Sequence, residues 1–146
     1  MKKTLLHRLF GWGRIPKRYV SRLRDEGIIL LDEGIGGSIT LKQFRAPGRY
    51  NYWKRSWFIG SIVLTDRTFA AFAFFKPIIY VPLDHENISE LSCTLEGGDT
   101  LIVKYGASAF NEKRSGAIEC RFKTSKAEMF CQWLTQRKSI GGRREA

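Results

Sequence analysis

The sequence has few residues of the types on which most enzymes and metal sites depend. It contains two histidines and three cysteines, and it has no P-loop, GxSxG, HExxH or GxGxxG motif. His85 lies in the polar segment Asp84–Asn87, and adjacent residues on a turn rarely converge on one metal ion. We therefore predict a non-enzymatic protein without catalytic residues, metal or cofactor.

Long apolar runs and paired cysteines are also lacking. The longest apolar run, residues 69–75, has seven residues, whereas a membrane-spanning helix needs about 20. An odd number of cysteines without CxxC spacing favours buried thiols in a reducing compartment. His7 and Arg8 interrupt the only candidate apolar region of a secretory signal. The expected location is cytoplasmic, with peripheral association with a membrane left open.

Acidic residues are missing from the first 24 residues, which carry eight lysines and arginines. The stretch 25–136 is balanced, with 13 basic and 13 acidic residues, although the whole chain has a formal net charge of +11. Most of the excess positive charge therefore belongs to an N-terminal extension, residues 1–26. A smaller basic tail follows at residues 139–146.

The hydrophobic pattern predicts helices at the two ends and strands between them. Leu5 to Phe10 has helical spacing, and Pro16 and Gly27 suit the start and end of a second helix. From residue 27 onward, short alternating runs separated by turn residues predict about seven strands. An apolar stripe at helical spacing then predicts a C-terminal helix. This stripe consists of Ala127, Phe130, Cys131 and Leu134, with Trp133 beside it.

Two segments decide how these strands connect. Asp32–Gly37 is rich in acid and glycine, so it is assigned to the loop between the first two strands. The aromatic stretch Tyr50–Leu64 is either one bent strand or two strands that break at Gly60.

Two short motifs resemble the GRAM and bacterial PH-like domains of the pleckstrin-homology superfold. Residues 60–69, Gly-Ser-Ile-Val-Leu-Thr-Asp-Arg-Thr-Phe, resemble the family pattern G-x-hydrophobic-x-L-T-x-x-R-hydrophobic. Val81-Pro82-Leu83 followed by Ile88 resembles its hydrophobic-P-L-x-x-I stretch. The resemblance implies a mainly β (α+β) fold, a bent seven-stranded antiparallel barrel capped by a C-terminal helix, over residues 27–138.

The same resemblance implies a binding module, because family members hold phosphoinositides or proteins. Lipid-binding members place several basic residues around the loop between their first two strands. The matching loop here, Asp32–Gly37, is acidic, and Lys42 and Arg45 lie beyond it. A specific inositol-phosphate pocket is therefore not expected at that loop.

The basic N-terminal segment is the first candidate binding surface, and three interpretations of it remain open. It packs on the domain with solvated cations, it docks on an anionic membrane or an acidic protein partner, or it grips nucleic-acid phosphates. The residues assigned to this surface are Lys2, Lys3, Arg8, Trp12, Arg14, Lys17, Arg18 and Arg22.

The segment Tyr50–Phe58 is the second candidate, with Trp53, Lys54 and Arg55 at its centre. Aromatic and cationic residues side by side can stack nucleic-acid bases or lie at a membrane interface. The favoured interpretation is that alternate aromatic side chains fill the barrel while the cations face water. A position at a loop tip would favour a contact surface instead.

Overall fold

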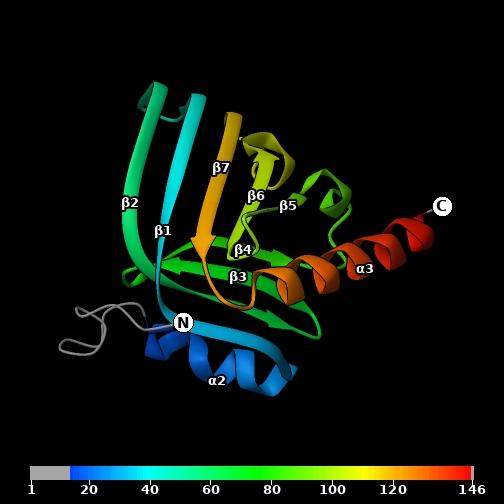
Figure 1. The fold of residues 1–146 in the computed structure, drawn as a ribbon. Helices are drawn as coiled ribbons and strands as arrows, with labels where there is room; N and C mark the ends of the chain where they lie inside the picture. The colour runs from blue at the N-terminus through cyan, green and yellow to red at the C-terminus, as the bar shows by residue number, and fades with distance from the viewer. Residues whose placement is uncertain (1–13, 146) are drawn as a thin grey trace.

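A bent antiparallel sheet with one helix on each side forms the structure, a computed structural model that describes residues 14–145, with side chains up to residue 137 (Figure 1). The helices are α2 (Lys17–Glu26) and α3 (Ala127–Glu145), and short 3₁₀ turns are η1 (Ile88–Glu90) and η2 (Ala107–Ala109). The strands are β1 (Ile28–Ala46), β2 (Arg49–Thr65), β3 (Thr68–Ala73), β4 (Lys76–Pro82), β5 (Ser92–Glu96), β6 (Thr100–Gly106) and β7 (Ser115–Lys123).

The seven strands form one sheet in the order β4-β3-β2-β1-β7-β6-β5. All neighbouring strands are antiparallel. This confirms the predicted mainly β (α+β) class with seven strands and a C-terminal helix. The predicted barrel is wrong in one respect, because the outer strands β4 and β5 do not pair and the sheet stays open. Contacts with α3 cover β5 instead.

The predicted connection at Asp32–Gly37 is wrong. These residues lie inside β1, where Gly34 adopts a φ of 70° at a bulge between the pairs that Glu33 and Ile35 make with β2. The chain reverses later, at Pro47-Gly48, and Gly48 supplies the positive φ of 73° that this turn needs. The prediction failed because a bulge rich in acidic residues and glycine has the same composition as a turn.

Tyr50–Leu64 belongs to one continuous strand, and Gly60 lies where this strand bends (Figure 1). A side chain at Gly60 would overlap the carbonyl of Phe72 on β3. The glycine therefore allows the close approach of two backbones at the corner of the sheet.

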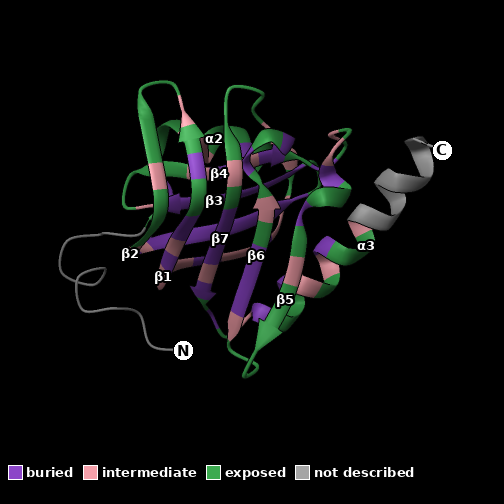
Figure 2. Cartoon of the chain, turned by 90° about the horizontal axis from the view of Figure 1, so that it is seen from above, coloured by how far each residue is buried: buried purple, intermediate pink, exposed green. Residues whose placement is uncertain are grey.

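The core has two parts, one on each side of the sheet (Figure 2). On one side, α3 buries Ala127, Phe130 and Leu134 against the concave face, which confirms the predicted apolar stripe. On the other side, α2 buries Leu23 against Phe72 and its neighbours. Helix α2 is thus packed on the sheet, and burying a leucine side chain contributes about 1.5–3 kcal/mol.

Polar contacts fasten the start of α3 to β1. The Thr124 hydroxyl donates to the buried Asp32 carboxylate over 2.6 Å, and the Lys126 ammonium donates to the Leu31 carbonyl over 2.6 Å. Asp32 is therefore part of the fold rather than of a solvated loop. Helix α3 continues through residues 139–145, which the sequence analysis assigned to the basic tail.

Candidate functional site

The two predicted surfaces lie on different elements. Lys2, Lys3, Arg8 and Trp12 fall outside the described residues. Arg14, Lys17, Arg18 and Arg22 lie on α2 or just before it. Trp53, Lys54 and Arg55 lie on β2 near the β1–β2 turn. In Figure 1, α2 and this turn are at opposite ends of the molecule, so they form two separate surfaces.

The cations of α2 are partly engaged within the molecule. The Arg18 guanidinium lies 5.0 Å from the centre of the Tyr19 ring, and Arg22 lies 5.7 Å from that of Tyr80. Arg22 also lies 3.7 Å from Glu26, so its charge is partly neutralised. A hollow of about 370 Å³ beside the helix is lined by Lys17, Val20, Ser21, Arg24 and Asp25. The outer face of α2 thus mixes both signs of charge.

The β1–β2 hairpin carries a denser basic group. No acidic residue occurs between Glu33 and Asp66, although this stretch holds five cations: Lys42, Arg45, Arg49, Lys54 and Arg55. Among the described residues, none of these five lies within ion-pair distance of a carboxylate. Lys42 is near enough to Glu119 to interact with its charge, and the charges of Arg45, Arg49, Lys54 and Arg55 are available to a partner.

Three of these cations lie over aromatic rings instead. The guanidinium of Arg45 is 4.9 Å from the centre of the Tyr50 ring, and that of Arg55 is 5.4 Å from the Trp53 ring. Arg49 lies 5.5 Å from the ring of Phe44, which Arg114 of the β6–β7 connection also approaches at 5.9 Å. Cation–π contacts hold the charged groups beside the aromatic surface without neutralising them.

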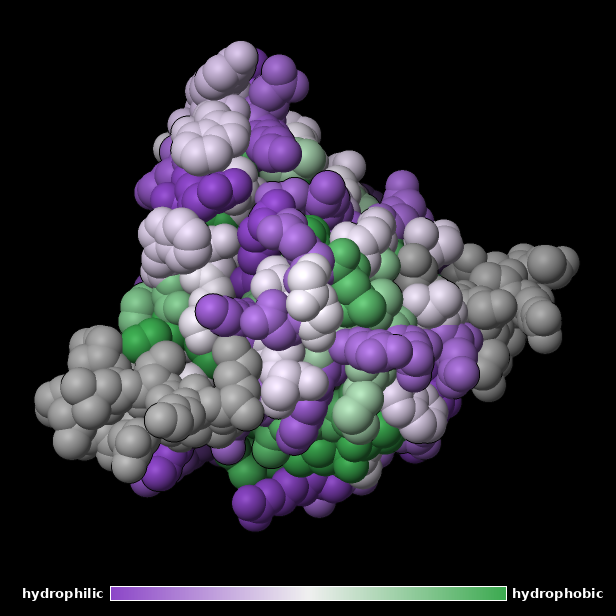
Figure 3. Space-filling model, in the orientation of Figure 1, coloured by the Kyte–Doolittle hydropathy of each residue, from purple (hydrophilic) through white to green (hydrophobic). Residues whose placement is uncertain are grey.

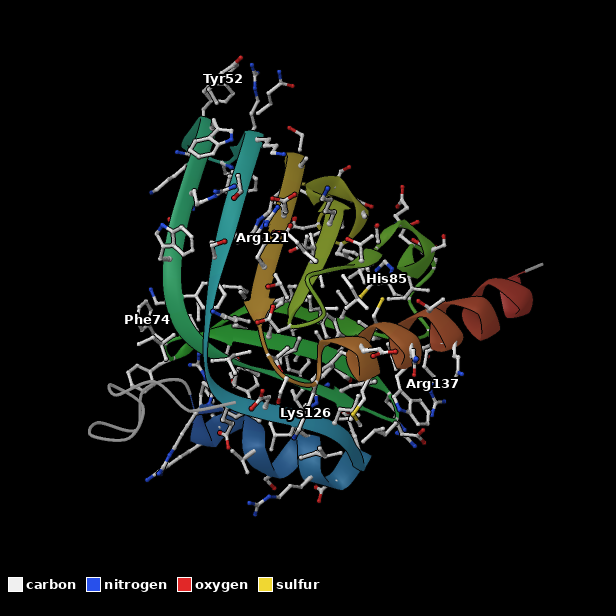
Figure 4. The ribbon with its side chains drawn as sticks, viewed as in Figure 1. Tyr52, Phe74, His85, Arg121, Lys126 and Arg137 are labelled. Atoms are coloured by element: carbon white, nitrogen blue, oxygen red, sulfur yellow. The ribbon has the colours of Figure 1, made fainter. Side chains whose placement is uncertain are left out.

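Six exposed aromatic residues gather along β2 and the adjoining β3–β4 turn, and we call them the aromatic edge. Its members are Tyr50, Tyr52, Trp53, Trp57, Phe74 and Phe75. Trp57 is 73% exposed and Tyr52 is 72% exposed, and Tyr52 lies at the free end of the hairpin (Figure 4). Over this end of the molecule, hydrophilic side chains and side chains of intermediate hydropathy alternate (Figure 3).

The favoured interpretation of Tyr50–Phe58 is therefore wrong. Of its aromatic residues only Phe58 is buried, while Tyr50, Tyr52, Trp53 and Trp57 face solvent. The reason is that β3 pairs with β2 only from Gly60 onward, so the part of β2 that carries these rings lies at the margin of the sheet. Exposed aromatic side chains gathered in this way are unusual outside interaction sites.

On β7 and β6, level with Arg55 and Thr40 in the strand register, the same sheet face carries ion pairs. Glu119 of β7 lies 3.3 Å from Lys104 and 3.4 Å from Arg121, and Arg121 also contacts Glu96 at 2.9 Å. Burial alone would raise the pKa of Glu119, but the Lys104 hydrogen bond and the nearby Lys42 charge lower it below its usual value. These charges stabilise the sheet.

Two residues with potential chemical reactivity, His85 and Cys120, make contacts within the fold. His85 accepts a hydrogen bond from the Asn87 N–H over 3.0 Å and packs against the Phe110 ring. Burial raises the pKa of the Cys120 thiol to about 12, so it carries no thiolate at neutral pH. In the described part of the chain, no three His, Cys, Asp or Glu residues are grouped to hold a metal ion.

Sequence analysis missed that the hairpin is a basic surface in its own right. The net charge of the stretch 25–136 is zero, so counting over that window hid the acid-free run between Glu33 and Asp66. A shorter window would have found it. Lys42 and Arg45 were placed beyond the loop because the turn was assigned to Asp32–Gly37 rather than to Pro47-Gly48.

A scan against protein-family models and a search of curated protein sequences found no match to this chain. Between residues 14 and 145, no helix combines the length and the apolar character needed to cross a membrane.

Proposed function

We propose that this chain is a non-enzymatic, PH/GRAM-like binding module that holds an acidic protein partner on the aromatic edge and the cations beside it. The observation that carries the proposal is the group of exposed aromatic rings around four cations, Arg45, Arg49, Lys54 and Arg55, which lie within ion-pair distance of no carboxylate among the described residues. Aromatic and arginine residues are enriched in protein interfaces, and arginine pairs with carboxylates in bidentate geometry.

The family assignment is part of this proposal. It is supported by the motifs at residues 60–69 and 81–88, together with the antiparallel sheet followed by a C-terminal helix. The acidic partner is the one predicted for the N-terminal segment, but the hairpin fits it better. The α2 cations lie beside Asp25 and Glu26, whereas residues 34–65 of the hairpin include no acidic residue.

Two other ligand classes fit the surface less well. A nucleic-acid base that stacks on Trp53 would compete with Arg55 for the ring face that the guanidinium covers. A membrane would take up the aromatic rings, but backbone polar groups that lack a partner are costly in hydrocarbon. A polypeptide can satisfy both the rings and the backbone.

The experiment follows tryptophan fluorescence during titration with a short peptide that alternates valine and glutamate, and with a matched peptide in which lysine replaces glutamate. We expect the acidic peptide to bind at least about tenfold more tightly at low salt, and added salt to reduce the difference. Equal affinity for the two peptides would overturn the proposal.

A pair of charge-reversal variants places the site. We expect Arg49→Glu, Lys54→Glu and Arg55→Glu together to abolish binding of the acidic peptide. The matched control combines Lys17→Glu, Arg18→Glu and Arg22→Glu on α2 and should bind like the original protein. The opposite result would move the site to the N-terminal surface. Tighter binding to anionic vesicles or to mixed-sequence oligonucleotides than to the peptide would assign the hairpin to a membrane or to nucleic acid.

A further inference from the structure

Strand β2 is much longer than the strand that covers its outer side. β3 pairs only with Gly60–Leu64, whereas β2 begins at Arg49. Within residues 14–145, the part of β2 before Gly60 pairs with β1 alone. In Figure 1 this part forms the left-hand margin of the sheet. This part of β2 has an unpaired edge, at the position that β3 would occupy if it were longer.

The backbone groups along this edge have a defined direction. The Ile59 carbonyl accepts a hydrogen bond from the Phe74 N–H over 2.8 Å, so the peptide groups of Ile59 point away from β1. Direction alternates along an extended strand in an antiparallel sheet. The N–H and C=O groups of Trp53, Arg55 and Trp57 therefore point outward along the same edge.

The side chains of these residues share one face. Arg55 donates to the hydroxyl of Thr40, its partner on β1, over 3.0 Å, which places Arg55 on the outer face. Phe58, of the opposite parity, is buried. A strand added here would have Trp53, Arg55 and Trp57 on one side. Phe74, in the β3–β4 turn, marks its end at Ile59 (Figure 4).

The two terminal edges of the sheet are less suited to accept a strand. β4 contains Pro77 and Pro82, which have no N–H to donate, and β5 contacts α3. Residues 49–59 of β2 contain no proline. This edge therefore has the continuous row of donors and acceptors that strand addition requires.

We infer that an extended acidic segment of a partner protein adds to residues 53–58 of β2 as a further strand. The inference rests on the proposed function and specifies its binding mode. Carboxylates on one face of the incoming strand would lie beside Arg55, while its backbone bonds to the outward groups of Trp53, Arg55 and Trp57.

Charge distinguishes this occupant from the two that the chain itself could provide. In a second copy paired antiparallel on the same edge and centred on Arg55, the two Arg55 guanidinium groups would face each other across the strand pair, which is destabilising. Residues 1–13 contain no aspartate or glutamate and carry three lysines and arginines, so they repel this edge as well.

The decisive probe is the valine–glutamate peptide in two forms, one unmodified and one N-methylated at alternate residues on the edge that faces β2. Methylation removes the backbone donors and keeps the side chains. We expect it to weaken binding at least about tenfold, since the backbone bonds to β2 are lost. Equal binding of both forms would overturn strand addition but leave the proposed function standing. No binding of either form would overturn both.

A pair of variants tests the same bonds from the side of the protein. Arg55→Pro removes an outward N–H from an edge position where proline is tolerated, and Arg55→Ala removes only the side chain. We expect the proline variant to bind the unmodified peptide at least about fivefold more weakly than the alanine variant, with similar circular dichroism. Equal affinity would contradict the inference.

Hydrogen exchange and sedimentation complete the test. Binding of the peptide should slow amide exchange at Trp53, Arg55 and Trp57, and unchanged exchange there would place the peptide elsewhere. The protein without peptide should sediment as a monomer. A dimer that Arg55→Pro dissociates would assign the edge to a second copy and overturn the inference.

Discussion

The N–H of Phe74 donates to the carbonyl of Ile59, and this bond marks the point where β3 leaves the edge of β2. From this point toward the hairpin end, β3 no longer pairs with β2, and the exposed aromatic residues begin. Phe74 takes a φ of 57°, which is uncommon for a residue other than glycine. The chain thus turns sharply at the place where the aromatic edge starts.

The alternation of backbone direction predicts an exchange pattern in the protein without ligand. Amide hydrogens of Trp53, Arg55 and Trp57 should exchange faster than those of Lys54 and Ser56, which bond to β1. Hydrogen exchange measured by NMR checks this residue by residue. Uniformly slow exchange across residues 53–58 would mean that another segment already covers the edge.

The corner of the sheet depends on the absence of a side chain at Gly60. We expect Gly60→Ala to lower the free energy of unfolding by at least about 2 kcal/mol, because its methyl group would overlap the Phe72 carbonyl. Gly36→Ala is the matched control, since a methyl group there meets nothing within 4 Å. Urea denaturation of both variants measures the difference, and equal stabilities would refute the packing argument.

The contact between Thr124 and Asp32 should contribute measurably to stability. Thr124→Val keeps the shape of the side chain but leaves the buried carboxylate without this donor. We expect the free energy of unfolding to fall by about 1.5–3 kcal/mol, the usual range for a hydrogen bond to a charged group. Ser125→Ala, at the exposed neighbouring position, should change stability by less than about 0.5 kcal/mol. Thermal denaturation monitored by circular dichroism makes the comparison.

The lowered pKa of Glu119 predicts how stability depends on pH. Its pKa is lower in the folded than in the unfolded protein. The ionised Glu119 carboxylate therefore stabilises the folded state at every pH above its unfolded-state pKa. This stabilisation is lost as the pH falls through the folded-state pKa of Glu119. Glu119→Gln should therefore destabilise the protein at neutral pH and flatten the acid side of the stability profile. Urea titrations at several pH values check this, and an unchanged acid slope would show that Glu119 contributes little.

Patterns between neighbouring residues explain which predictions succeeded. Helix α2 lies between Pro16 and Gly27 as expected, because both residues act locally on the backbone. The apolar stripe of α3 and the alternation of β7 depend only on which residues share a face. Such patterns are complete within one element, so they determined the helices, most strands and the mainly β class.

The first turn failed for a physical reason. Asp32–Gly37 has the composition of a loop, but pairing with β2 on one side and the buried contact to Thr124 on the other keep it extended. The exposure of Trp53 and Trp57 likewise depends on where β3 ends, many residues away in the sequence.

The sequence by itself determined a mainly β class of about seven strands with a helix before and after them, and an aromatic and basic stretch in the middle. Only the tertiary structure decided that this run is an uncovered edge, because exposure depends on whether a distant strand reaches it. The open sheet was also beyond the sequence patterns. Closure would require β4 and β5, the two outer strands, to pair, and no local pattern in either strand specifies its distance from the other.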